Sequence, residues 1–89
     1  MNTSPNKYPV TIARRAEARQ VVFDDDYLRC ELQDGRVISV PIVWYPRLLH
    51  ASREQREHYQ ISPGGYGIYW PDLDEDLSVK GFLAGVDGQ

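Results

Sequence analysis

Four carboxylates lie within five positions in the last third of the chain. They are Asp72, Asp74, Glu75 and Asp76 in the segment WPDLDEDL, and Tyr69 stands shortly before them. Carboxylate oxygens bind Ca²⁺ and Mg²⁺, act as general acids or bases when their pKa is raised, and form charged surfaces for partners. This segment therefore concentrates most of the chemistry that the side chains could perform.

The spacing Asp72-x-Asp74-x-Asp76 matches the first three ligand positions of an EF-hand calcium loop. The sixth position is Leu77, where that loop needs glycine, and the twelfth is Leu83, where it needs a bidentate glutamate. A calcium loop is therefore not predicted. A looser Mg²⁺ site needs only one or two carboxylates with water, so a metal-dependent enzyme that uses the acidic run stays open as an alternative.

Other catalytic arrangements lack a required residue. General acid or base catalysis needs a carboxyl group whose pKa is raised by burial, and a solvated run of acids offers no apolar pocket for that. Cys30 is expected on the inward face of a strand, with no histidine assigned to activate it. His50 and His58 stand eight positions apart, with no further His or Cys at metal-ligand spacing. We therefore expect no catalytic residue, no metal and no cofactor.

The acidic run has two further interpretations. Acids just before a helix are stabilised by its macrodipole, by about 0.3–1 kcal/mol each, and a short helix is expected after Ser78. Alternatively, the same acids together with Tyr69 could face a partner. The run therefore has a structural reason for its position, and a partner-binding surface remains open beside it.

Composition and charge describe one small folded domain. The chain has 89 residues, of which 42% are hydrophobic and 11% aromatic, which argues against disorder. Its net charge is −3, but residues 1–20 carry +3, which leaves −6 for the remainder. An acidic body is unsuited to nucleic acid. The basic residues Arg14, Arg15 and Arg19 nevertheless leave a DNA-binding regulator as an alternative.

Cysteine usage and hydropathy indicate the compartment. A single cysteine excludes an internal disulfide, and no stretch approaches the ~20 apolar residues of a membrane span. The first residues also lack the apolar run of a signal peptide. We therefore expect a cytoplasmic protein that does not contact a membrane.

The elements that must position these side chains follow from hydrophobic periodicity. One domain is expected over residues 18–85, with a flexible arm at 1–17 and a tail at 86–89. The segments ARQVVF and YLRCEL are predicted strands, and the second alternates cleanly between apolar and polar residues.

The next strand, RVISVPI, is predicted to form a hairpin whose register the apolar pattern fixes. A two-residue turn would place its apolar residues on the wrong face. A three-residue loop ending at Gly35 instead pairs Cys30 with Ile38 and unites the two apolar sets. We predict a type I turn with Gly35 in the left-handed conformation. Pro41 ends the ladder, because proline cannot donate a backbone hydrogen bond.

Three short helices are predicted. The first, in WYPRLLHA, has Pro46 in its first turn, a favoured place for proline. The second, in SREQREHYQ, has Ser52 as the N-cap of a capping box and many charges, so it should be largely solvated. The third follows Ser78, and Leu77 and Phe82 are spaced as a hydrophobic staple around that cap.

A later strand, YGIYW, completes the set. Tyr66, Ile68 and Trp70 alternate onto one face, Tyr69 lies on the other, and Pro71 stops the strand. These elements predict an α+β fold: a small antiparallel sheet, made of the N-terminal hairpin plus the later strand, packed against two or three short helices.

The segments LQDGRVISVPI, WYPRLLHASREQREHYQI and GYGIYWPDLDEDLSVKGFL resemble, in order and spacing, the bacterial domain-of-unknown-function family 2442 (DUF2442) over roughly residues 18–85. Members are uncharacterised as enzymes, and many are encoded beside a second small family in loci that look like toxin and antitoxin pairs. The resemblance therefore implies a partner-binding or antitoxin-like role. The family usually has histidine where this chain has Tyr69, which argues against a role that needs an imidazole there.

The prediction is thus a non-enzymatic protein-binding module, the antitoxin-like member of a two-gene system, whose partner is the product of a neighbouring gene. A homodimer stays open. The predicted partner-binding surface consists of Tyr69, Asp72, Asp74, Glu75 and Asp76.

Overall fold

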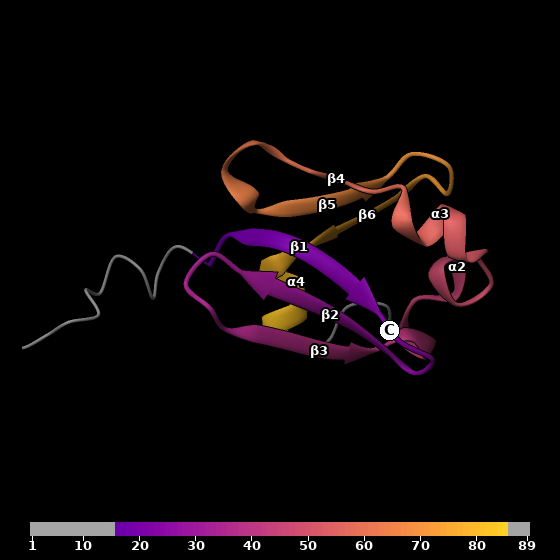
Figure 1. The fold of residues 1–89 in the computed structure, drawn as a ribbon, viewed down its shortest axis with the longest axis horizontal. Coiled ribbons are helices and arrows are strands. Elements are labelled where there is room, and N and C mark those ends of the chain that lie inside the picture. The colour runs from indigo at the N-terminus through magenta and orange to yellow at the C-terminus, as the bar shows by residue number, and fades with distance from the viewer. Residues whose placement is uncertain (1–15, 86–89) are drawn as a thin grey trace, which may run out of the picture.

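The computed structural model describes residues 16–85, so the predicted tail and all but the last two residues of the predicted arm lie outside the described part. Those residues form two three-stranded antiparallel sheets and several short helices (Figure 1). The predicted α+β class is confirmed. The later strand does not extend the N-terminal hairpin, however, because it belongs to the second sheet.

The first sheet has the order β1-β2-β3, with β1 at Ala18–Phe23, β2 at Tyr27–Leu32 and β3 at Val37–Pro41. Cys30 lies opposite Ile38, as the apolar pattern predicts. The three-residue hairpin loop is therefore confirmed, and β3 ends at its proline.

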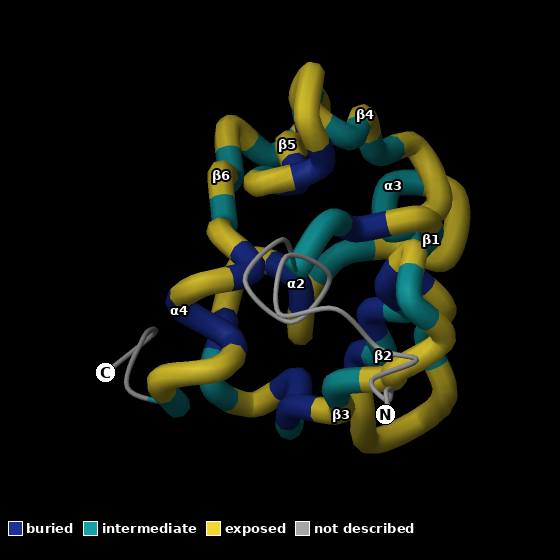
Figure 2. The backbone as a smooth tube through the Cα atoms, turned by 90° about the vertical axis from the view of Figure 1, so that its left-hand side faces the viewer, coloured by how far each residue is buried: buried dark blue, intermediate teal, exposed yellow. Residues whose placement is uncertain are grey.

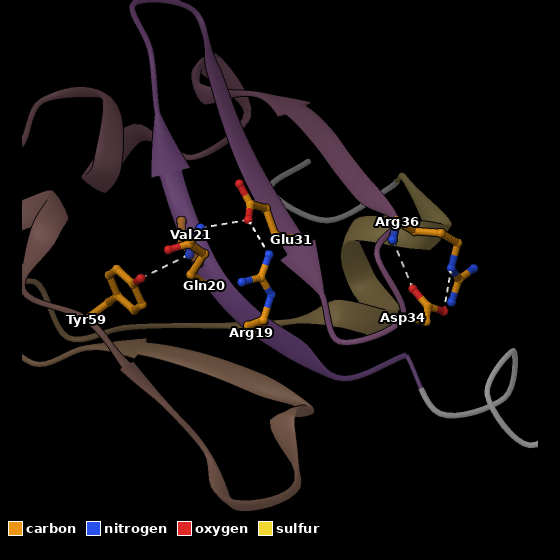
Figure 3. Close-up of polar contacts among 7 residues, drawn as sticks. All are labelled: Arg19, Gln20, Val21, Glu31, Asp34, Arg36 and Tyr59. Atoms are coloured by element: carbon orange, nitrogen blue, oxygen red, sulfur yellow. Dashed lines mark hydrogen bonds and ion pairs between the residues drawn. The ribbon is translucent and has the colours of Figure 1, made fainter.

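The loop between β2 and β3 is stabilised by local contacts. Gly35 has a φ of 95°, which glycine adopts without strain, and its N–H donates to the Leu32 carbonyl at 3.0 Å. The Asp34 carboxylate accepts from the backbone N–H and the Nε–H of Arg36 (Figure 3). These bonds, the backbone one first, lower the pKa of Asp34.

The second sheet has the order β4-β5-β6, with β4 at Gln60–Ile61, β5 at Gly67–Trp70 and β6 at Glu75–Ser78. The 3-10 helix η2 (Pro63–Gly65) links β4 to β5. The sequence pattern does not predict β4 or β6, because β4 has two residues and the sequence of β6, EDLS, begins with acids that strands disfavour.

The predicted helix caps are confirmed. Ser52 and Gln55 form the capping box, and the Ser78 hydroxyl accepts from the Gly81 N–H at 2.9 Å. No helix within residues 16–85 is long and apolar enough to cross a bilayer. Besides η2, the helical segments are η1 (Ile42–Trp44), α2 (Pro46–Leu49), α3 (Arg53–Glu57) and α4 (Val79–Ala84).

Both sheets and α4 contribute to one hydrophobic core (Figure 2). Phe82 is buried and Leu77 packs against the same core. Full burial stabilises each large apolar side chain by about 1.5–3 kcal/mol. The largest fully buried side chains are Trp70, Tyr45, Leu28, Leu32, Ile42, Leu48 and Ile68.

One predicted core residue lies outside the core. Tyr66 is 57% exposed, so it does not share the buried face of Ile68 and Trp70. The strand begins one residue later than predicted, at Gly67. Tyr66 instead has helical backbone angles at the end of η2, and its ring lies over Gly64, where a Cβ would come within 2.8 Å of the ring.

Candidate functional site

The predicted partner-binding residues lie on the hairpin formed by β5 and β6. β5 ends at Trp70, directly before Pro71, as predicted. Residues 71–74 form the turn, in which the Leu73 N–H donates to the Trp70 carbonyl at 3.1 Å. Asp74 has a φ of 52°, which Asp tolerates better than most residues with a side chain.

Glu75 and Asp76 lie in a strand and not in the approach to a helix. The macrodipole effect falls off beyond the first turn of a helix, and the first turn of α4 contains no acid, so that effect does not account for the position of these residues. The backbone of β6 pairs with β5, and Leu77 lies opposite Ile68 and packs against the core. Burial of that leucine and the ladder hydrogen bonds outweigh the poor strand propensity of the acids.

Asp72 belongs to an intramolecular pair. Its Oδ2 lies 2.9 Å from Nδ1 of His58, the residue that follows α3, and both side chains are about half exposed. This contact attaches the tip of the β5–β6 hairpin to the end of α3. The Asp72 carboxylate and the His58 ring nitrogen are therefore already paired within the molecule.

Glu75 is engaged by a different helix. Its side chain is partly buried and lies 3.8 Å from the Arg47 guanidinium of α2, which also donates to the Asp74 carbonyl at 2.7 Å. Burial raises the pKa of Glu75, and the Arg47 charge partly offsets that effect. Arg47 therefore attaches α2 to the same turn.

Tyr69 and Asp76 lie on the outer face of the second sheet. They are directly opposite across β5 and β6, and Gln60 of β4 continues the row. Tyr69 is 38% exposed, as predicted for the face away from the core. Gly67 lies beside the pair, so a Cβ there would be 3.9 Å from Oδ1 of Asp76. No hydrogen bond or ion pair joins either side chain to another described residue.

The predicted surface is thus divided by the fold. Tyr69 and Asp76 share an exposed face, Asp72 and Asp74 lie in the turn, and Glu75 lies against α2.

Comparison with known proteins places this arrangement in a family. The family described as "Protein of unknown function (DUF2442)" matches residues 18–88. The chain belongs to the DUF2442 family. No curated protein matches the chain.

Two solved structures are similar to this DUF2442 chain. A protein of unknown function from Rhodospirillum rubrum is 30% identical, with a TM-score of 0.71, over 83% of this chain and 92% of that one. The solution structure of an uncharacterized protein from Chromobacterium violaceum is 26% identical, with a TM-score of 0.70, over 100% and 90% of the two chains.

The expectation that burial raises the pKa of no acid in the run is wrong for Glu75, because burial does raise the pKa of that carboxyl group. No three His, Cys, Asp or Glu side chains within residues 16–85 are grouped to hold a metal ion. Burial raises the pKa of the Cys30 thiol to about 11, so the thiol is protonated at neutral pH and is a poor nucleophile.

The predicted basic arm lies mostly outside the described residues. Arg14 and Arg15 belong to that part, whereas Arg19 lies in β1. The Arg19 guanidinium pairs with the Glu31 carboxylate at 2.8 Å (Figure 3). Arg19 is therefore already engaged with the first sheet.

Sequence reasoning missed the side chains that hold the hairpin and α3 in place. The charges of α3 predict a solvated helix, yet Arg56 donates to the carbonyls of Leu48 and Leu49 and lies over the Phe23 ring. The Tyr59 hydroxyl accepts from the Val21 N–H at 3.0 Å. The partners are at least seven positions away, so no local pattern could have indicated them.

Proposed function

We propose that this DUF2442 protein is a non-enzymatic protein-binding module, the antitoxin-like member of a two-gene system in the cytoplasm. Its partner is the product of a neighbouring gene. The binding surface is the outer face of the β4-β5-β6 sheet around Tyr69 and Asp76.

The single observation that carries the proposal is the state of these two side chains. Tyr69 and Asp76 are exposed side by side and make no polar contact with other described residues, while Asp72 and Glu75 are used within the fold. Tyrosine is enriched among the residues that dominate binding energy at interfaces. A carboxylate beside it favours association with a basic partner, as does the net charge of −3.

Co-expression with the neighbouring gene product, followed by purification of the complex and titration calorimetry, tests the proposal. Tyr69→Ala should weaken binding about tenfold or more, because a truncated hot spot costs more than ~1.4 kcal/mol. Asp76→Asn should mainly slow association at low salt. A growth assay should show that the wild-type chain protects cells from the neighbouring product and that Tyr69→Ala does so less well.

Tyr27→Ala is the matched control, because Tyr27 is 42% exposed and lies in β2 of the other sheet. It should leave the affinity within about twofold. Equal affinities for the Tyr69→Ala variant and the wild type would refute this surface. The absence of both a complex and growth protection would refute the antitoxin-like role.

A further inference from the structure

An open strand edge faces α3 in the first sheet. Among residues 16–85, β1 pairs only with β2. The Asp24 N–H donates to the Tyr27 carbonyl, and bonded pairs alternate along an antiparallel ladder, so Val22 and Asp24 direct their backbone N–H and C=O groups toward β2. Val21 and Phe23 therefore direct theirs away from β2. The bond from the Val21 N–H to Tyr59, in the segment after α3, confirms that direction (Figure 3).

Tyr59 covers only part of this edge. It accepts from Val21, but the N–H and C=O of Phe23 make no hydrogen bond to other described residues. These groups adjoin a groove of about 390 Å³ between the end of β1 and α3. An edge strand with unpaired groups is a template for an added strand.

Acids line this groove as well as arginines: Asp24, Asp25 and Glu57 lie beside Arg53 and Arg56, and the Asp24 carboxylate is paired with Arg29. The charge next to Phe23 is that of Arg56, which forms no ion pair with a described carboxylate. The Arg56 guanidinium lies 5.4 Å from the centre of the Phe23 ring and uses two of its five N–H donors on the carbonyls of Leu48 and Leu49. The Arg53 side chain is 89% exposed, and its closest carboxylate, on Glu57, is 3.9 Å away. This long and solvent-exposed pair holds Arg53 only weakly, so its guanidinium can turn to a partner's acid.

We propose that this edge binds an extended segment of a partner protein, which pairs with Phe23 as an added strand and carries an acidic residue next to an apolar one. The residue opposite Phe23 lies on the same side of the sheet as the Phe23 ring and meets Arg56 and Arg53. Its neighbour lies beside the exposed Val22, where an apolar side chain packs. The surface shares no residue with the face around Tyr69 and does not depend on it.

The experiment titrates the ¹⁵N-labelled full chain with the blocked pentapeptide Glu-Val-Glu-Val-Glu. Saturable amide shifts are expected at Val22, Phe23 and Asp24, with a Kd of about 1 mM. The corresponding Lys-Val-Lys-Val-Lys peptide should bind at least fivefold more weakly. Methylation of the backbone nitrogen of the central glutamate should abolish binding, because it removes the donor to Phe23.

Arg53→Glu should reduce the preference for the glutamate peptide at least threefold, and glutamate suits the first turn of α3. Lys80→Glu makes the same change of charge on α4 and should leave the preference unchanged. The outer edge of β3 is an internal control, so Val37 and Ser39 should not shift. Shifts of equal size at that edge, no saturation at Phe23, or an unchanged preference in Arg53→Glu would each overturn the proposal. Tyr69→Ala should bind the peptide normally.

Discussion

Both sheets are antiparallel and three-stranded, yet they are held together differently. In the first sheet the strands have five or six residues, and the β2–β3 turn is closed by contacts among Leu32, Asp34, Gly35 and Arg36. In the second sheet the strands have two to four residues, and its hairpin is held by Arg47 and His58 from helices or their ends. The β2–β3 turn therefore relies on neighbours in sequence, whereas the β5–β6 turn also relies on tertiary contacts.

Replacement of Trp70 should have the largest effect on stability and should affect the second sheet more than the first. Trp70→Ala should lower the free energy of unfolding by about 3–5 kcal/mol, because the fully buried ring contacts Phe23 and Tyr59 and its Nε1–H donates to the Arg56 carbonyl. Urea unfolding measures the loss, and hydrogen exchange should show that β5 loses more protection than β2. A loss below about 2 kcal/mol, or equal loss of protection in both strands, would contradict the comparison.

Alanine substitutions at two glycines with positive φ separate the cost of backbone strain from the cost of a steric clash with a distant segment. Gly65→Ala should cost about 2–4 kcal/mol, since a Cβ at that position would lie 2.8 Å from the Glu17 Cβ and 3.0 Å from the Ala18 nitrogen. Gly35→Ala should cost about 1 kcal/mol, because nothing lies within 4 Å and only backbone strain is added. Thermal and urea unfolding give both values. Equal costs would mean that the contact between η2 and the start of β1 is unimportant.

The hydroxyl of Tyr59 should have a smaller effect. Tyr59→Phe should destabilise the fold by about 1–2 kcal/mol, because it leaves the N–H of the buried residue Val21 without its acceptor. Tyr69→Phe removes the same atom from the exposed face and should change stability by less than about 0.5 kcal/mol. If the two variants were equally stable, Tyr59 would not contribute to holding β1 against the second half of the chain.

The smallest expected effects concern the pH dependence of stability. Glu75 in the β5–β6 hairpin and Asp34 in the β2–β3 turn should change the free energy of unfolding in opposite directions as the pH rises. Burial raises the pKa of Glu75 in the folded state above its ordinary value of 4.5, so its ionisation destabilises the fold. The stability of the wild type relative to Glu75→Gln should therefore fall as the pH rises from about 4.5. Urea unfolding at a series of pH values checks this, and an unchanged difference would contradict it.

Asp34 should act in the reverse sense. Its pKa is lowered, first by the Arg36 N–H, so its contribution is present above the ordinary value of 3.8 and is lost as the pH falls below that value. The stability of the wild type relative to Asp34→Asn should therefore fall on acidification in the same series of measurements. If the stability difference between the wild type and Asp34→Asn did not change with pH, the contacts of Asp34 would stabilise its ionised and protonated forms equally.

Local sequence rules predicted the first sheet and the caps well. The alternation in YLRCEL and the glycine after Asp34 were sufficient for the register of β2 with β3. Ser52 and Ser78 were predicted correctly as N-caps, because the groups that they bind are three residues away.

The second sheet and the candidate surface were predicted less well. The strand at Glu75–Ser78 was missed, and the four acids of the run were treated as one group although they lie in three environments. The deciding contacts join residues far apart in sequence: His58 with Asp72, Arg47 with Asp74, and Val21 with Tyr59. No short window of sequence contains both members of these pairs.

The sequence by itself determined the α+β class, the register of the first hairpin, the caps of two helices and the family to which the chain belongs. These features rest on interactions between residues a few positions apart, whose geometry the chain specifies locally. Only the tertiary structure decided that Tyr69 and Asp76 stay exposed together while Asp72 and Glu75 are engaged, and that β1 presents an open edge to α3. The side of a short strand that faces solvent depends on what packs against it, and that packing is fixed only when the whole core assembles.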